Sequence, residues 1–337
     1  MIAKDITVRQ VLTRLGILEH LNAEGVTEVM INRPHEVFIE GNHGIDRIED
    51  SRLTLSSLME LANTLAIYND KHISPNNPMH SVTLPDGERC HIIMPPACES
   101  GTVVFSFRKP SLSRFTLDDY ANTGRLAQFK RVSNVQANGD APLADFEKQL
   151  MAYQKAGQLA DFFRLAVSSK LNICMVGGTG SGKTTFTKSI ADLVPESTRI
   201  ITIEDTHELD LPNHPNRVHL FYKEQITAKD ILASCMRLKP DRIFLTELRG
   251  DEAWDYLSAL NTGHQGGLTS VHANDAQSVF YRIAQLAKES SAGAGMDYDY
   301  ILSIVRSTID VVCFFEKTKL KELYYDPIAK QQALAGR

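Results

Sequence analysis

Cysteine, tryptophan and long apolar runs are all scarce in this sequence. Its 337 residues include five cysteines, an odd number with no Cys-x-x-Cys pair, which predicts reduced thiols and no four-cysteine metal site. The longest apolar runs, at residues 173–176 and 311–315, are far shorter than the roughly 20 residues that span a bilayer. The first residues lack the apolar core of a secretory signal. We therefore expect a cytoplasmic protein that reaches a membrane only through a partner.

Positive charge is not in excess either. The formal net charge is −5, which argues against bulk electrostatic binding to nucleic acid. The single tryptophan, Trp254, falls in an expected helix and does not suggest a platform for stacking bases. The length predicts two domains or one large one, with a core that needs neither disulfides nor metals.

Two patterns of secondary structure divide the chain. Apolar periodicity predicts helices over residues 8–21 and 52–70, and short β runs occur at 26–32, 36–40, 101–110 and on both sides of the Asp86-Gly87 turn. These predict an N-terminal α+β domain with a mostly antiparallel sheet, residues 1–115. The pattern weakens over 116–158, which we interpret as a linker. Alternating strands and helices then predict a parallel α/β domain over 159–337, so that the chain as a whole is of the α/β class.

Residues 177–185, "GGTGSGKTT", fit the phosphate-loop pattern, Walker A, in full. Glycines let backbone N–H groups turn inward around an anion, and the helix that begins near Lys183 points its positive end at the phosphates. Lys183 would reach the β and γ oxygens of ATP, and the Thr184 hydroxyl would ligate Mg²⁺. The predicted nucleotide-binding residues are Gly178, Thr179, Gly180, Ser181, Gly182, Lys183, Thr184 and Thr185.

Acidic residues follow two further apolar strands. Glu204 ends the strand in "RIITIEDTHEL", and Glu247 follows the strand in "PDRIFLTELRG". Acids at the carboxyl ends of parallel strands lie beside the phosphate loop. One can hold Mg²⁺ and the other can orient the attacking water, and the sequence leaves open which does which. The metal-site prediction is therefore Thr184, Glu204 and Glu247.

Histidines form a third group of candidates. His272 ends the apolar strand in "GGLTSVHAND" and could report the presence of a γ-phosphate, although a satisfied core histidine is equally expected. His207, His214 and His219 lie around two prolines in what reads as an irregular loop. Their spacing predicts no metal site.

Four blocks, "GGTGSGKTT", "TIEDTHEL", "DRIFLTELRGDEA" and "TGHQGGLTSVHAND", occur in the order typical of one superfamily. The chain resembles the ATPases of bacterial type II and type IV secretion machines. With "GVTEVMINRPHEVFIE" and "LDLPNHPNRVHLFY", it most resembles the VirB-type traffic ATPases of type IV secretion. One departure is Thr246, where the family usually has glycine before the glutamate.

The resemblance implies a homohexamer of RecA-like P-loop ATPase domains under a ring of N-terminal domains, with nucleotide between the two domains. Arginines of the N-terminal part would close on the phosphates, and Arg108 and Arg114 are the candidates; the alternative is that they are surface or packing arginines. The implied partners are other cytoplasmic ATPases and inner-membrane components of the machine, so the protein would lie peripherally at the inner membrane.

The function hypothesis is therefore hydrolysis of Mg-ATP that powers assembly of, or transfer through, a type IV secretion or conjugation system. The catalytic residues would be Lys183, Glu204, Glu247, His272, Arg108 and Arg114. The alternatives are a nucleic-acid-dependent motor of the RecA or helicase type, a pilus-retraction ATPase, and a nucleotide-gated scaffold without turnover.

Overall fold

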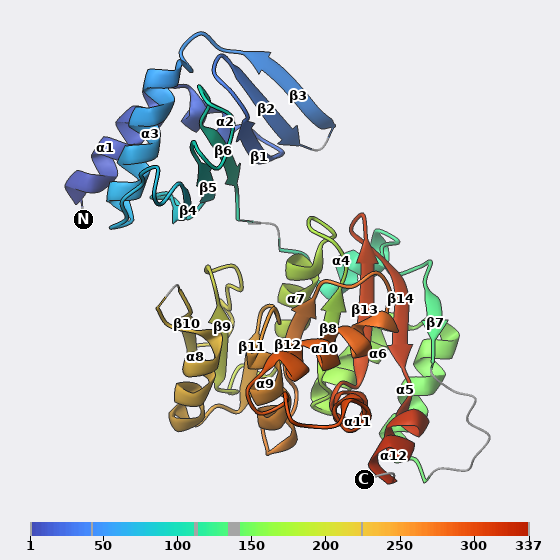
Figure 1. The fold of residues 1–337 in the computed structure, drawn as a ribbon. Coiled ribbons are helices and arrows are strands. Elements are labelled where there is room, and N and C mark those ends of the chain that lie inside the picture. Colours follow the sequence, from blue (N-terminus) through green and yellow to red (C-terminus); the bar gives the residue numbers. More distant parts are fainter. Residues whose placement is uncertain (1, 42, 111–113, 134–141, 224, 336–337) are drawn as a thin grey trace. The chain divides into compact units, whose positions relative to one another are not determined.

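A computed structural model describes residues 2–41, 43–110, 114–133, 142–223 and 225–335. The chain forms two compact units, Met1–Leu112 and Ser113–Arg337. Figure 1 labels the helices and strands of both units.

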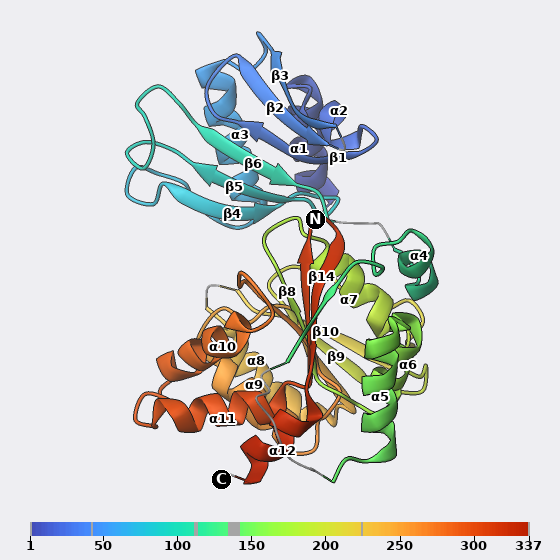
Figure 2. The same ribbon diagram turned by 90° about the vertical axis from the view of Figure 1, so that its right-hand side faces the viewer.

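The first unit is an antiparallel sheet covered on one face by helices (Figure 2). Its strands lie in the order β3-β2-β1-β6-β5-β4, and every neighbouring pair is antiparallel. The strands are β1 (Val26–Ile31), β2 (Glu36–Gly41), β3 (Gly44–Glu49), β4 (Met79–Thr83), β5 (Arg89–Ile93) and β6 (Val104–Arg108). The helices are α1 (Ile2–Arg14), α2 (Ile17–Asn22) and α3 (Leu55–Tyr68). This confirms the predicted α+β architecture. The sequence missed β3 because all six of its residues are exposed, which leaves no buried face to produce an alternating pattern.

The second unit is built on a sheet whose eight described strands follow the order β10-β9-β11-β12-β8-β13-β14-β7. The six strands from β10 to β13 run parallel, and β14 turns back antiparallel to β13. The strands are β7 (Lys130–Val132), β8 (Ile173–Val176), β9 (Ile200–Glu204), β10 (Arg217–Phe221), β11 (Arg242–Leu245), β12 (Leu268–Val271), β13 (Val311–Glu316) and β14 (Lys319–Tyr325). Every residue of β8, β9, β11 and β12 is buried. Strands buried on both faces read as continuous apolar runs, which is why the parallel α/β class could be predicted.

Helices cover both faces of this sheet (Figure 2). On one face lie α4 (Leu117–Asn122), α5 (Asp145–Ala156), α6 (Leu159–Ser168) and α7 (Lys183–Ala191). On the other lie α8 (Ala228–Cys235), α9 (Glu252–Asn261), α10 (Ser278–Glu289) and α11 (Tyr298–Thr308), and α12 (Pro327–Ala335) follows β14. Two separate apolar cores result, one on each side of the sheet. In the part of the chain that the structure describes, no helix is both long and apolar enough to cross a membrane.

The structure differs from the prediction of a linker over residues 116–158, because the described part of this segment is folded. Its described part forms α4, β7 and α5, which belong to the second unit, and the boundary between the units falls after Leu112. Tyr120 of α4 is 2% exposed, and its ring centroid lies 5.0 Å from that of Phe186 in α7. β7 pairs with β14 through Lys130–Val132. A six-residue helix and a three-residue strand are too short to show periodicity. Residues 134–141, which hold most of the turn-forming stretch "QANGDAP", lie outside the described residues.

Candidate functional site

The motifs singled out in the sequence meet at one edge of the second sheet. In the order β9-β11-β12-β8 these four parallel strands are neighbours. Glu204 is the last residue of β9, Glu247 follows β11, His272 follows β12, and Gly177 follows β8. Because the carboxyl ends of parallel strands share one edge, these side chains and the phosphate loop form one region.

The phosphate loop leaves β8 at Gly177, whose φ of 145° is left-handed. A Cβ atom at this position would lie 2.3 Å from the carbonyl oxygen of Phe315, so only glycine fits. The loop ends at Gly182, and α7 begins at Lys183 with its amino end toward the loop. The buried Ser181 hydroxyl has no hydrogen-bond partner among the described residues. An open helix start and an unsatisfied buried hydroxyl fit a phosphate group.

Lys183 and Thr184 lie where the loop pattern predicts. The Lys183 ammonium donates to the carbonyl oxygens of Gly177 and Gly178, at 2.7 Å each. The Thr184 hydroxyl donates to Oε2 of Glu208 at 3.2 Å. A hydroxyl beside a carboxylate is an oxygen donor set that suits Mg²⁺. Glu208, which no motif singled out as a metal ligand, is thus the acid that contacts Thr184.

The structure brings Glu247 and His272 together. Oε1 of Glu247 lies 3.1 Å from Nε2 of His272, and Oε2 accepts a 2.6 Å hydrogen bond from Arg249. Arg249 also donates to Asp205 at 2.7 Å, which ties the ends of β9 and β11 to each other. Burial, followed by the nearby Lys183 charge, lowers the pKa of His272, so its ring is neutral near pH 7. The hydrogen bond to Glu247 raises the pKa of Arg249.

Glu204 has a different environment, because its side chain is 0% exposed and both oxygens are engaged. Oε2 accepts hydrogen bonds from the backbone N–H groups of Glu208 and Leu209, at 2.9 and 2.8 Å. Oε1 accepts one from the Thr202 hydroxyl at 2.9 Å. Burial opposes ionisation of Glu204, but the nearby His219 ring and the hydrogen bonds from the loop outweigh it and hold the pKa of the carboxyl below its usual value. The carboxylate therefore fixes the loop that follows β9.

The two candidate arginines belong to different units. Arg108 ends β6 of the first unit, and its guanidinium lies 3.7 Å from a carboxylate oxygen of Glu28. Arg114 lies in the second unit, where it pairs with Asp192 and donates to the carbonyl oxygen of Asp210. Asp192 caps the carboxyl end of α7, and the phosphate loop precedes its amino end. Arg114 is thus anchored about 13 Å along that helix from the loop, at 1.5 Å per residue.

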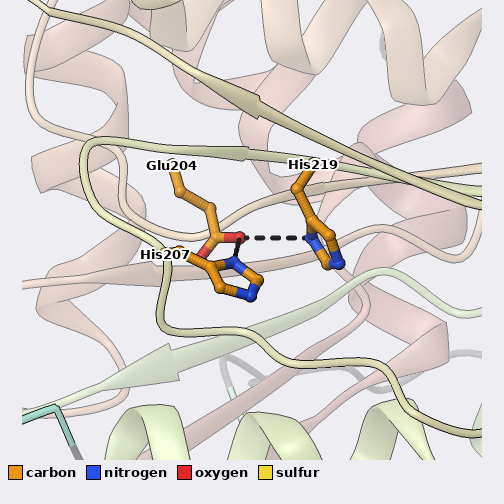
Figure 3. A group of neighbouring side chains, drawn as sticks. All are labelled: Glu204, His207 and His219. Carbon is orange, nitrogen blue, oxygen red and sulfur yellow. Dashed lines mark ion pairs between the residues drawn. The ribbon is translucent and has the colours of Figure 1, made fainter. Parts of the chain in front are cut away.

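Sequence reasoning missed a group formed by Glu204, His207 and His219 (Figure 3). His219 lies in β10, paired with Thr202 of β9, and not in the irregular loop that was expected. Its Nδ1 lies 3.6 Å from Oε1 of Glu204, and Nδ1 of His207 lies 3.4 Å from the same oxygen. The two prolines before β10 suggested a loop and so hid this strand from the sequence analysis. The alternation in "RVHLF" is a signal that could have predicted the strand.

A parallel sheet with a phosphate loop, a neighbouring acid and a histidine at strand ends defines an ATPase domain of the RecA-like type. Residues 141–315 match the family model described as type II/IV secretion system protein. The chain belongs to this family, and within it to the VirB-type traffic ATPases.

Similar proteins cover nearly the whole chain. The type IV secretion system protein VirB11 of Brucella suis is 40% identical over 91% of this chain and 87% of its own. VirB11 of Bartonella henselae is 38% identical, over 98% of this chain and 97% of its own. The crystal structure of the Brucella suis VirB11 ATPase in complex with sulphate is 37% identical, with a TM-score of 0.55 over 99% of this chain and 98% of that one. The pilus retraction motor PilT with bound ADP is 17% identical, with a TM-score of 0.59 over 96% of this chain and 87% of that one, and shows the fold alone.

Proposed function

We propose that this chain hydrolyses Mg-ATP and, as a homohexamer, powers the assembly of a type IV secretion system or the transfer of substrate through it. The observation that carries the proposal is the contact of Glu247 with His272 beside a complete phosphate loop. The names of its relatives, VirB11 proteins of type IV secretion systems, support the biological setting.

The loop would hold ATP through backbone N–H groups at the start of α7. Lys183 would exchange its two carbonyl acceptors for the β and γ oxygens of ATP. The exchange is favourable because hydrogen bonds between an ammonium and a charged phosphate are stronger than those to a neutral carbonyl. Thr184 and Glu208 are the residues that would hold Mg²⁺, and the bound ion would neutralise charge on the phosphates.

Glu247 is the residue we assign to the attacking water. Its side chain is 18% exposed, and Arg249 holds one carboxylate oxygen while the other faces His272. Glu204 is fully buried with both oxygens occupied, so we assign it to positioning the loop and not to contact with the water. The water oxygen bonds to the γ-phosphorus as the bond to the β–γ bridging oxygen breaks. Glu247 accepts the proton, and ADP and phosphate leave.

Loss of phosphate would remove contacts to His272 and to arginines of the N-terminal part, and so convert hydrolysis into motion. Arg108 remains a candidate for this role. Arg114, which belongs to the second unit, would first have to leave Asp192 to reach the phosphates. We propose peripheral association with the inner membrane through other components of the machine, because the relatives are secretion-system proteins.

Phosphate release from Mg-ATP tests the proposal. Lys183→Ala removes the ammonium that reaches the phosphates, so we expect it to abolish release while the chain stays folded. Lys155→Ala removes an exposed lysine of α5 and serves as the control with normal turnover. Normal turnover in a folded Lys183→Ala variant would refute the assignment. Mass measurement in solution tests the ring, and a stable monomer with and without ATP would contradict it.

A further inference from the structure

Two histidines and a glutamate from separate segments converge beside the acid loop. Glu204 ends β9, His207 lies in the loop that follows, and His219 lies in the neighbouring strand β10 (Figure 3). One ligand atom from each side chain lies within 4.8 Å of the other two. We propose that these three residues bind a divalent transition-metal ion, with Zn²⁺ as the ion of choice, at a site separate from the nucleotide magnesium.

The separations suit tetrahedral coordination. Ligands at about 2.0–2.2 Å from a tetrahedral Zn²⁺ are about 3.3 Å from one another. Nδ1 of His207 and Nδ1 of His219 lie 3.4 and 3.6 Å from Oε1 of Glu204. The two rings meet at 63°, with their centroids 4.4 Å apart. Small side-chain adjustments would therefore bring all three atoms onto one ion.

The donor types select the ion. Two imidazoles with one carboxylate suit Zn²⁺ and other late first-row ions, whereas Mg²⁺ and Ca²⁺ prefer oxygen ligands. A deprotonated carboxylate and neutral imidazoles are the ligand forms that bind such an ion. His207 is 47% exposed, which provides an entry path and leaves the fourth coordination position open to water.

Groups around the three ligands orient them. The Thr202 hydroxyl donates to Oε1 of Glu204 and lies 2.8 Å from Nδ1 of His219. Binding the ion requires that Nδ1 of His219 carry no proton, with the ring proton on Nε2. Thr202 would keep its bond to Glu204, which is the supporting role that outer-shell groups play at metal sites.

The site connects to the phosphate loop through Glu204. The other oxygen of this carboxylate holds the backbone N–H groups of Glu208 and Leu209, and Glu208 accepts a hydrogen bond from Thr184. An ion on Oε1 would join β10, the end of β9 and His207, and so brace the segment that carries Glu208. The proposal does not depend on ATP hydrolysis, and it can fail while the proposed function stands.

Cobalt binding tests the site, because tetrahedral Co²⁺ gives strong visible absorption bands. The whole 337-residue chain, stripped of metal and without nucleotide, should bind one Co²⁺ per chain with these bands, and Zn²⁺ should abolish them. We expect His207→Gln and His219→Gln each to weaken binding by at least about tenfold, since each removes a direct ligand. His272→Gln is the matched control, because His272 contacts a carboxylate elsewhere, and it should leave the affinity unchanged.

Chemical labelling of the unaltered protein gives a second measurement that no folding defect of a variant can disturb. Zn²⁺ should slow the reaction of diethyl pyrocarbonate with His207 and His219, read by mass spectrometry, and leave the exposed His43 unaffected. Three results would each overturn the proposal: absence of the Co²⁺ bands, a Co²⁺ affinity in both ligand variants equal to that of the unaltered protein, or labelling that Zn²⁺ does not change.

Discussion

Replacing Glu204 tests whether this buried carboxylate holds the loop that follows β9. In Glu204→Ala the backbone N–H groups of Glu208 and Leu209 lose their acceptor. Hydrogen bonds to charged groups contribute about 1.5–3 kcal/mol each. Since about 1.4 kcal/mol corresponds to a tenfold change, we expect amide exchange at these two positions to rise by roughly 10- to 100-fold.

Hydrogen exchange read by mass spectrometry on a peptide covering residues 205–210, without nucleotide, measures this effect. Glu204→Gln keeps a neutral acceptor, so it should give an intermediate rise. Glu196→Ala is the control, because it removes an exposed acid outside this loop and should leave the exchange unchanged. If exchange in Glu204→Ala equals that of the unaltered protein, the carboxylate does not hold the loop.

Two further predictions concern the phosphate loop and His272. Gly177→Ala should weaken ATP binding by more than about tenfold, because its Cβ would meet the Phe315 carbonyl. Gly178→Ala, whose Cβ would meet nothing within 4 Å and whose φ is not left-handed, should weaken binding less, and equal affinities in a fluorescence titration would refute the steric argument. The pKa of His272 is lowered on folding by burial and by Lys183, so its contribution to stability is full above about pH 6.5 and declines below it. On acidification to about pH 5.5, the melting temperature should fall more in the unaltered protein than in His272→Gln. Equal falls would contradict the pKa direction.

Local patterns allowed much of the site to be predicted. The phosphate loop, the acid after β11 and the histidine after β12 each follow a buried apolar strand, and such strands end at one edge of a parallel sheet. The contact of Glu247 with His272 follows from β11 and β12 being neighbours. No local pattern gives that neighbour order.

The contacts that could not be predicted join residues far apart in the sequence. Arg114 contacts Asp192 across 78 residues of sequence, which no spacing in the sequence indicates. His219 reaches Glu204 only because β10 pairs in register with β9. Tyr120 was assigned to a linker because the sequence around it does not show that its ring packs against Phe186 of α7.

Single-turnover phosphate release from Mg-ATP, compared between two isosteric variants, tests the central claim most directly. The account predicts that Glu247→Gln slows release by about 10²- to 10⁴-fold, the usual contribution of a general base. Glu204→Gln should remain within about tenfold of the unaltered protein, because it acts only through the loop. Normal release by Glu247→Gln, with the larger loss in Glu204→Gln, would contradict the account.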